Sequence, residues 1–170
     1  MSWVSDFRSD LDTYKRPRVP AVRAMVTWRG LWALLQFRVA HRYRRCSVLQ
    51  PVLLAWRLIV EAATGICIGS EAEIGPGLHI SHADRIVISG AAIIGRGCCI
   101  AHGVTVGVDG RHSGAPIIGN GVGIGPNAVV AGPIKIGDGA MIGANCVVFR
   151  DVPQGARVRP APTSVTLRVE

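Results

Sequence analysis

Two histidines, His82 and His102, are the side chains of this sequence best suited to proton transfer. An imidazole has an unperturbed pKa near 6.5, so its neutral form is plentiful at neutral pH and can take a proton from a hydroxyl group. The two residues are 20 positions apart. They can act together only if the fold returns the chain to the same place after that interval.

A six-residue repeat over residues 68–153 predicts such a fold. Each unit begins with an aliphatic residue, usually followed by glycine, and its fifth position is usually small. The aliphatic first positions are Ile68, Ile74, Ile80, Ile88, Ile94, Ile100, Val106, Ile118, Ile124, Val130, Ile136, Ile142 and Val148. This period is typical of a parallel β-helix, in which three units close a triangular coil and the coils stack about 4.8 Å apart.

The repeat is interrupted at two places, which is where a solenoid has its loops and sites. Two extra residues at 85–87 delay the next unit, and the run 109–116 loses the apolar pattern and predicts an extruded loop. One coil of 18 residues plus the two inserted ones equals the interval between His82 and His102. We therefore predict that the two rings stack on the same face of adjacent coils, within about 5 to 7 Å.

The N-terminal part of the sequence is more basic than the repeats. Residues 1–65 hold 11 Lys and Arg against 4 Asp and Glu, whereas residues 66–170 hold 8 against 7. Such a basic segment suits an anionic membrane surface, the phosphates of a substrate, nucleic acid or a solvated helix face. Of these partners we expect no nucleic acid, and we retain peripheral contact with the membrane surface.

Helical periodicity indicates an N-terminal helical segment. Helices are expected over residues 2–14, 21–28, 31–45 and about 51–63. In the third helix Arg38, Arg42, Arg44 and Arg45 are predicted to lie outside, and Gly65 is expected to end the last.

The predicted organisation is a helical segment at 1–65, a β-helix domain at 66–155 and a C-terminal tail at 156–170. The sequence has neither an uncharged apolar run of 18 residues nor a signal-peptide pattern. Its five cysteines lack CxxC spacing. We expect reduced thiols in a cytoplasmic protein.

Two segments give the sequence a specific likeness. LLQFRVAH (34–41) and GICIGSEAEIGPGLHISHADRIVI (65–88), leading into the hexapeptides, resemble the serine acetyltransferase family. The likeness covers about residues 30–155 and is greatest to the branch associated with polysaccharide and capsule biosynthesis. It implies a mainly β fold, a left-handed parallel β-helix with a short N-terminal helical segment. It also implies a homotrimer or trimer-based hexamer and acetyl transfer from acetyl-CoA to a hydroxyl, with no metal.

The resemblance also suggests roles for residues near the two histidines. His82 matches the family's catalytic histidine, and His102 is expected to tune it or to polarise the carbonyl. Ser81 replaces an acidic residue that holds the amino acid in serine-specific enzymes. We expect Ser81, Asp84 and the loop residue His112 to contact the acceptor.

Two further positions depart from the family pattern. Cys67 replaces the acidic residue that orients the catalytic base, and Ala115 replaces a second histidine. Asp84, Glu61 or a carboxylate of a neighbouring subunit could orient His82 instead. Cys67 itself is interpreted as a buried small residue, with a nucleophile as the alternative.

Acetyl-CoA is expected along the groove between neighbouring β-helices. The matching small residues, together with one arginine near the nucleotide phosphates, are Gly107, Gly125, Ala131, Gly143, Ala144 and Arg150. Arg157 and Arg159 are further phosphate candidates.

The sequence therefore predicts an acetyl-CoA-dependent O-acetyltransferase acting on a saccharide or polysaccharide precursor. One alternative is a serine O-acetyltransferase of cysteine biosynthesis, and another is a non-enzymatic β-helix scaffold. A γ-type carbonic anhydrase has similar repeats but needs three zinc-binding histidines. The closely spaced second and third histidines of such a site are absent after His102.

Overall fold

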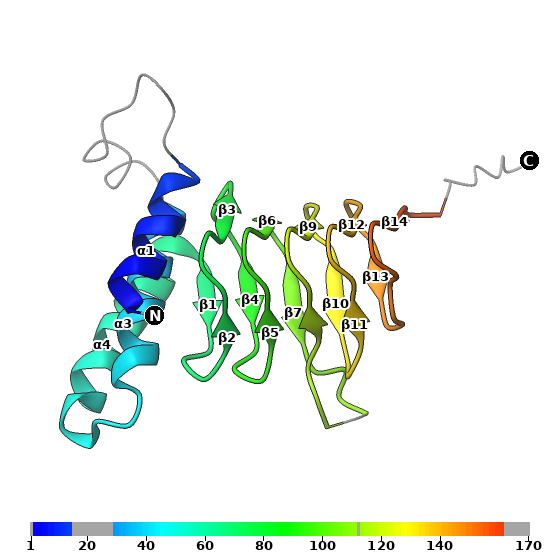
Figure 1. Ribbon diagram of the computed structural model, residues 1–170. Helices are drawn as coiled ribbons and strands as arrows, with labels where there is room; N and C mark the ends of the chain where they lie inside the picture. Colours follow the sequence, from blue (N-terminus) through cyan, green and yellow to red (C-terminus); the bar gives the residue numbers. More distant parts are fainter. Residues whose placement is uncertain (1, 15–28, 112, 162–170) are drawn as a thin grey trace, which may run out of the picture.

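The computed structural model describes residues 2–14, 29–111 and 113–161. Helices α1 (Trp3–Asp12), α3 (Arg29–Tyr43) and α4 (Gln50–Thr64) pack at one end of a column of short strands (Figure 1). A 3₁₀ turn, η1 (Ser47–Leu49), precedes α4. The helix predicted at 21–28 lies outside the described residues.

The strands form three parallel sheets that wind into a β-helix of five stacked coils. Sheet 1 has the order β1-β4-β7-β10-β13, sheet 2 the order β2-β5-β8-β11, and sheet 3 the order β3-β6-β9-β12-β14. The bounds are β1 Ile66–Ile68, β2 Glu73–Ile74, β3 His79–Ser81, β4 Ile86–Ile88, β5 Ile93–Ile94, β6 Cys99–Ala101, β7 Thr105–Gly107, β8 Ile117–Ile118, β9 Gly123–Ile124, β10 Val129–Ala131, β11 Lys135–Ile136, β12 Met141–Ile142, β13 Val147–Val148 and β14 Arg157–Val158. The predicted fold class is confirmed.

The interior of the β-helix is built from the aliphatic first positions of the repeat. Ile74, Ile94, Ile118 and Ile136, for example, are all buried and lie in register on successive strands of sheet 2. Each fully buried side chain of this size contributes about 1.5 to 3 kcal/mol from removal of its apolar surface from water. The column of isoleucines therefore fixes the register that also aligns the polar residues outside.

The lengths of the coils agree with the two predicted interruptions. Ile86 pairs with Ile66, 20 residues earlier, and Ile117 pairs with Ile93, 24 residues earlier, because the extruded loop leaves between β7 and β8. The last coil is two residues short, since Val152 bridges to Ile136. The β-helix also continues through β14, so the predicted boundary at residue 155 is too early.

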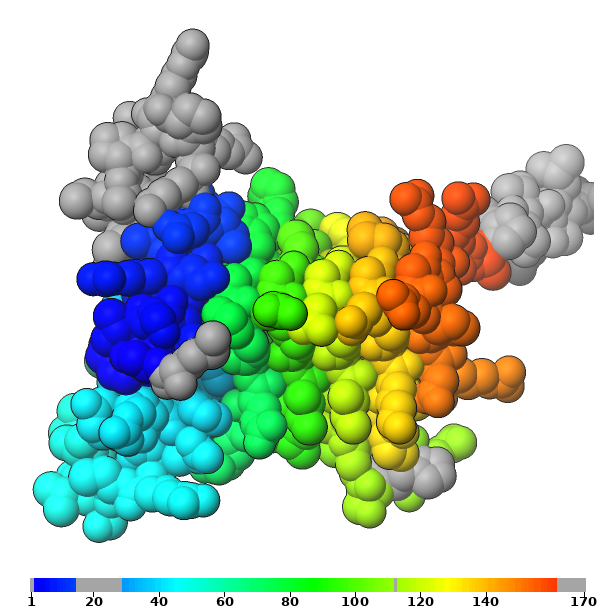
Figure 2. All heavy atoms as spheres, viewed as in Figure 1, coloured from blue at the N-terminus to red at the C-terminus, as the bar shows by residue number. Residues whose placement is uncertain are grey.

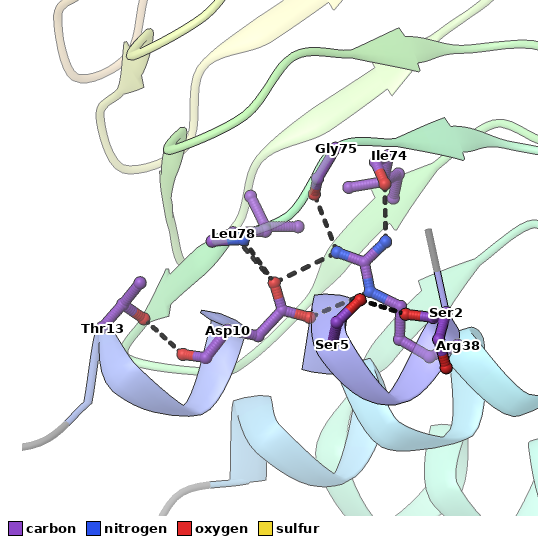
Figure 3. A network of polar contacts seen from close by, with 9 residues as sticks. Ser2, Ser5, Asp10, Thr13, Arg38, Ile74, Gly75 and Leu78 are labelled. Atoms are coloured by element: carbon purple, nitrogen blue, oxygen red, sulfur yellow. Dashed lines mark hydrogen bonds and ion pairs between the residues drawn. The ribbon is translucent and has the colours of Figure 1, made fainter. Parts of the chain in front are cut away.

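A buried ion pair joins the helices to the first coil. Arg38 contacts the Asp10 carboxylate at 2.9 Å and donates to the carbonyl of Gly75 (Figure 3). Asp10 accepts in turn from the backbone amides of Gly77 and Leu78. The prediction that Arg38 lies outside is wrong, because its charge is matched by Asp10 and by carbonyls that the open edge of the coil leaves unpaired.

Tyr14 completes this cover of the edge. Its hydroxyl donates to the carbonyl of Ile80 at 2.9 Å and accepts from the Ile80 amide at 2.7 Å. The space-filling view shows the helical segment closing this end of the β-helix (Figure 2). The first coil, from which the site is built, therefore has a fixed edge.

Candidate active site

The two histidines meet at the corner where sheet 3 passes into sheet 1, called here the histidine corner. Ser81 of β3 pairs with Ala101 of β6, so the residues that follow them, His82 and His102, lie at equivalent places on adjacent coils. Their ring centroids are 6.2 Å apart and the rings meet edge to face at 87°. The predicted proximity is confirmed, although the rings do not stack face to face.

The backbone at His82 is in the left-handed region, with φ of 55°. The residues of later coils with this conformation at the histidine corner are one position further on: Gly103, Asn127 and Asn145. In the first coil this conformation occurs at two residues, His82 and Arg85 (φ of 47°). Arg85 is in register with Gly103, so the two-residue insertion adds a second left-handed residue at the histidine. A non-glycine residue in this region is disfavoured by about 1 to 3 kcal/mol. The insertion after His82 is the sequence signal for this feature, although counting along the repeat does not reveal the backbone conformation.

The imidazole nitrogens at this corner are available for a ligand. The Nδ1 atom of His102 is buried and has no hydrogen-bond partner among the described residues. The ring of His82 is exposed and makes no hydrogen bond within the same part of the chain. A buried polar atom without a partner is costly, so a hydroxyl-bearing ligand beside His102 would relieve an existing penalty.

Neither carboxylate predicted to orient His82 does so in the single chain. Glu61 accepts from Arg57 at 2.6 Å, and Arg57 also contacts the Cys67 sulfur at 3.6 Å. Burial raises the pKa of the Cys67 thiol, which favours the neutral form and argues against a nucleophile. The interpretation of Cys67 as a buried small residue is wrong, because it is half-buried at the outward position of β1, between the buried Ile66 and Ile68.

The other predicted carboxylate, Asp84, is exposed and pairs with Arg85 at 3.4 Å. Its backbone carbonyl accepts from the amide of Gly103. Asp84 thus helps to hold the inserted residues against the next coil, at the same corner as the histidines.

The predicted cofactor residues divide between two corners. Gly125 and Gly143 are in register with Ser81 and Ala101, and Ala144 follows, so these three lie at the histidine corner. Gly107 and Ala131 pair with each other at the end of sheet 1, and Arg150 lies just beyond the end of β13 in the same sheet. This second place, where the extruded loop leaves, is called here the loop corner.

The glycines at the two corners differ in what surrounds them. A β-carbon at Gly125 would lie 2.7 Å from the amide nitrogen of Ala144, so coil stacking itself requires this glycine. A β-carbon at Gly107 would meet no atom within 4 Å, and the space beside Gly107 is open to a ligand.

The β-helix region has two further histidines, His79 and His112. His112 lies outside the described residues, and its loop begins at the loop corner rather than beside His82. His79 approaches the Thr13 hydroxyl at 3.1 Å and its ring lies 4.4 Å from that of Tyr14. His79 therefore packs against the helical segment. Within the described ranges, no three His, Cys, Asp or Glu side chains are grouped as a metal site would require.

Comparisons with known proteins identify relatives of both the repeat sequence and the fold. The family model described as bacterial transferase hexapeptide (six repeats) matches residues 115–150. The solved serine acetyltransferase of Neisseria gonorrhoeae, in complex with serine, superposes with a TM-score of 0.83 at 30% identity, over 96% of this chain and 68% of that chain. The chain belongs to the hexapeptide transferase family. The soybean serine acetyltransferase apoenzyme gives the same TM-score at 36% identity, over 92% of this chain and 65% of the soybean chain.

Among curated members of the family, serine acetyltransferase 2 of Arabidopsis thaliana is 35% identical over 114 residues. That match covers 65% of this chain, and the chain spans about a third (35%) of the plant protein's length. These relatives are named for serine acetylation, and they give no support to the predicted polysaccharide branch.

Proposed function

We propose that this hexapeptide transferase moves an acetyl group from acetyl-CoA to a hydroxyl of a small acceptor, with His82 as the general base. The observation that supports it most is the pair of imidazoles at the histidine corner, 6.2 Å apart. Among the described residues neither the His82 ring nor Nδ1 of His102 has a hydrogen-bond partner. The relatives named for acetyl transfer support the same reaction class.

In the proposed step a ring nitrogen of His82 takes the proton of the acceptor hydroxyl as its oxygen attacks the thioester carbonyl. The carbonyl electrons move onto oxygen and return as the carbon–sulfur bond breaks. The leaving CoA sulfur then takes the proton from the His82 imidazolium. A positioned base of this kind contributes about 10² to 10⁴ to the rate.

The division of the cofactor residues supports a site shared between two copies of the chain. Gly107, Ala131 and Arg150 are separated from His82 by the width of sheet 1. A groove between two β-helices can bring the loop corner of one copy beside the histidine corner of the other. We therefore propose a trimer or a trimer-based hexamer in which acetyl-CoA lies in that groove.

L-serine is the acceptor that the comparisons favour, because the relatives above are named for serine and one solved structure contains it. Ser81 favours a second candidate, a saccharide hydroxyl. Beside His82 it offers a neutral hydroxyl, whereas a substrate ammonium group bound away from water needs a paired carboxylate.

Release of free CoA from acetyl-CoA, measured with L-serine and with a panel of sugar nucleotides and oligosaccharides, tests both acceptors. We expect CoA release that depends on the acceptor and falls by at least about 10² in a His82→Gly variant. Turnover of serine alone would exclude the saccharide. If no acceptor gives turnover and acetyl-CoA does not raise the melting temperature, the chain is a scaffold and the proposal is wrong.

A further inference from the structure

Helix α4 presents a continuous apolar face that the described chain does not cover. Exposed side chains on this face include Val52 (64% exposed), Leu58 (56%) and Ile59 (67%). The other exposed residues of the helix are Pro51, Leu54, Ala55, Ala62 and Ala63, so none of the exposed positions within α4 after Gln50 is polar. An exposed apolar patch of this kind marks an interaction site.

The opposite side of α4 holds it against the protein. Leu53, Val60 and Thr64 are the buried positions of the helix, and Arg57 and Glu61 pair with each other at its flank. Figure 1 shows α4 running from the outer end of the helical segment up to β1. The helix is therefore a fixed element that keeps one face directed outward.

The charges around this face are positive. Residues 29–60 contain six arginines and no Asp or Glu. Carboxylates from elsewhere in the chain pair with three of these arginines, Arg38, Arg44 and Arg57. Arg45 is exposed just before η1, where Gln50 bonds to the carbonyl of Arg44. At the other end of α4, the exposed Arg29 donates to the carbonyl of Ala63. The apolar face therefore has an arginine near each end.

Further positive charge lies beside the first of these ends. Arg42, Arg44 and Arg45 line a cavity of about 420 Å³ together with Trp3 and Asp6. Arg44 is paired with Glu71 at 3.1 Å. Within the described residues no carboxylate forms an ion pair with Arg42 or Arg45, so both guanidinium groups are available to external anions.

We propose that α4 lies flat on an anionic phospholipid surface, with Val52, Leu58 and Ile59 among the acyl chains and Arg29, Arg42 and Arg45 on headgroup phosphates. A helix with one apolar face and adjoining basic residues binds a membrane interface through both features. Juxtamembrane arginines are attracted to the negative leaflet. The protein would then work at the membrane surface rather than in free solution.

Charge complementarity favours a bilayer over a second copy of the chain as the occupant of this face. A second copy that docks through the same face brings its own Arg29, Arg42 and Arg45, none of which forms an ion pair within the described residues. An anionic bilayer supplies phosphates along the whole edge of the face.

The contacts of α4 favour a helix that lies on the membrane over one that crosses it. Among the described residues Ser47–Thr64 is one helical stretch that is long and apolar enough to span a bilayer, and 17% of it is buried inside the protein. That stretch ends in direct continuity with β1 of the folded β-helix, and its buried residues pack against α3. Leaving the interface to span the bilayer would strip α4 from those contacts.

The test is sedimentation of the full chain with vesicles of phosphatidylcholine alone and of phosphatidylcholine mixed equally with phosphatidylglycerol. We expect binding to the anionic vesicles that weakens with salt. A Val52→Asp/Ile59→Asp variant should lose it, whereas Val108→Asp, at an exposed position of the extruded loop, should retain it. Arg42→Gln/Arg45→Gln should lose about fivefold per arginine, and Arg96→Gln/Arg111→Gln on the β-helix should lose little.

Three results would overturn the proposal. The first is no binding to anionic vesicles. The second is binding that resists an alkaline carbonate wash, which would indicate a spanning helix. The third is an unchanged vesicle affinity of Val52→Asp/Ile59→Asp together with a smaller oligomer in vesicle-free buffer, which would assign the face to a second copy. Circular dichroism of each variant confirms that it is folded.

Discussion

The side chain proposed as the base belongs to one of two residues in the first coil, His82 and Arg85, that have left-handed backbone at the histidine corner. His82 has φ of 55°, whereas later coils place glycine or asparagine in this conformation. Strain of this kind persists only where the surrounding structure imposes it, and it is common at functional sites. The insertion after His82 thus accompanies a disfavoured backbone at the residue whose ring faces His102.

We predict that His82→Gly lowers kcat by at least about 10² while leaving the free energy of unfolding unchanged or higher by up to about 1 kcal/mol. Glycine adopts the left-handed conformation without steric cost but supplies no base. Urea unfolding and CoA-release kinetics on the same preparation measure the two effects.

His79→Ala is the matched control for this prediction. It should show the opposite pattern, because His79 contacts Thr13 and Tyr14 and has no proposed chemistry. We expect a loss of about 1 kcal/mol in stability and little change in kcat. Similar kinetic effects of the two substitutions would argue against His82 as the base.

At the scale of elements, stacking of the coils decides which glycines are required. We predict that Gly125→Ala costs about 1 to 3 kcal/mol, because its new methyl group would lie 2.7 Å from the Ala144 amide. Gly107→Ala should change stability by no more than about 1 kcal/mol, since nothing lies within 4 Å of the added carbon. Thermal unfolding compares the two variants.

The Gly107→Ala variant also tests the proposed acetyl-CoA groove. A methyl group at Gly107 would enter the space proposed for the cofactor, so Gly107→Ala should raise the KM for acetyl-CoA in a normally stable protein. An unchanged KM would remove Gly107 from the proposed groove.

The junction of helices and β-helix depends on the buried pair of Asp10 and Arg38. Asp10→Ala would leave Arg38 without its carboxylate and two backbone amides of the first coil without an acceptor. We predict a loss of about 3 to 5 kcal/mol for this substitution. The Asp10→Ala/Arg38→Met double variant should lose less than the sum of the single losses, as measured by a double-mutant cycle in urea. Additive losses would show that the two residues act independently.

For the whole molecule, a site shared between copies makes activity depend on assembly. Light scattering should give a multiple of the 18.0 kDa chain, at least a trimer. Mixing His82→Gly subunits with Ala131→Trp subunits, each inactive alone, should restore part of the activity, because some grooves then combine an intact histidine corner with an intact loop corner. An active 18.0 kDa monomer, or mixtures that stay inactive after subunit exchange, would contradict the shared site.

The sequence alone determined the β-helix, its two interruptions and the meeting of His82 with His102. These follow from a strict period, because a register fixed by buried isoleucines places every outer residue by counting. The same counting could not show that the backbone turns left-handed at His82, since that depends on how the inserted residues pack against Gly103. It also placed Arg38 outside, because helical periodicity cannot recognise a charge whose partners, Asp10 and the carbonyls of Ile74 and Gly75, come from elsewhere in the chain. The division of the small residues between two corners likewise appeared only when the three sheets closed around the core.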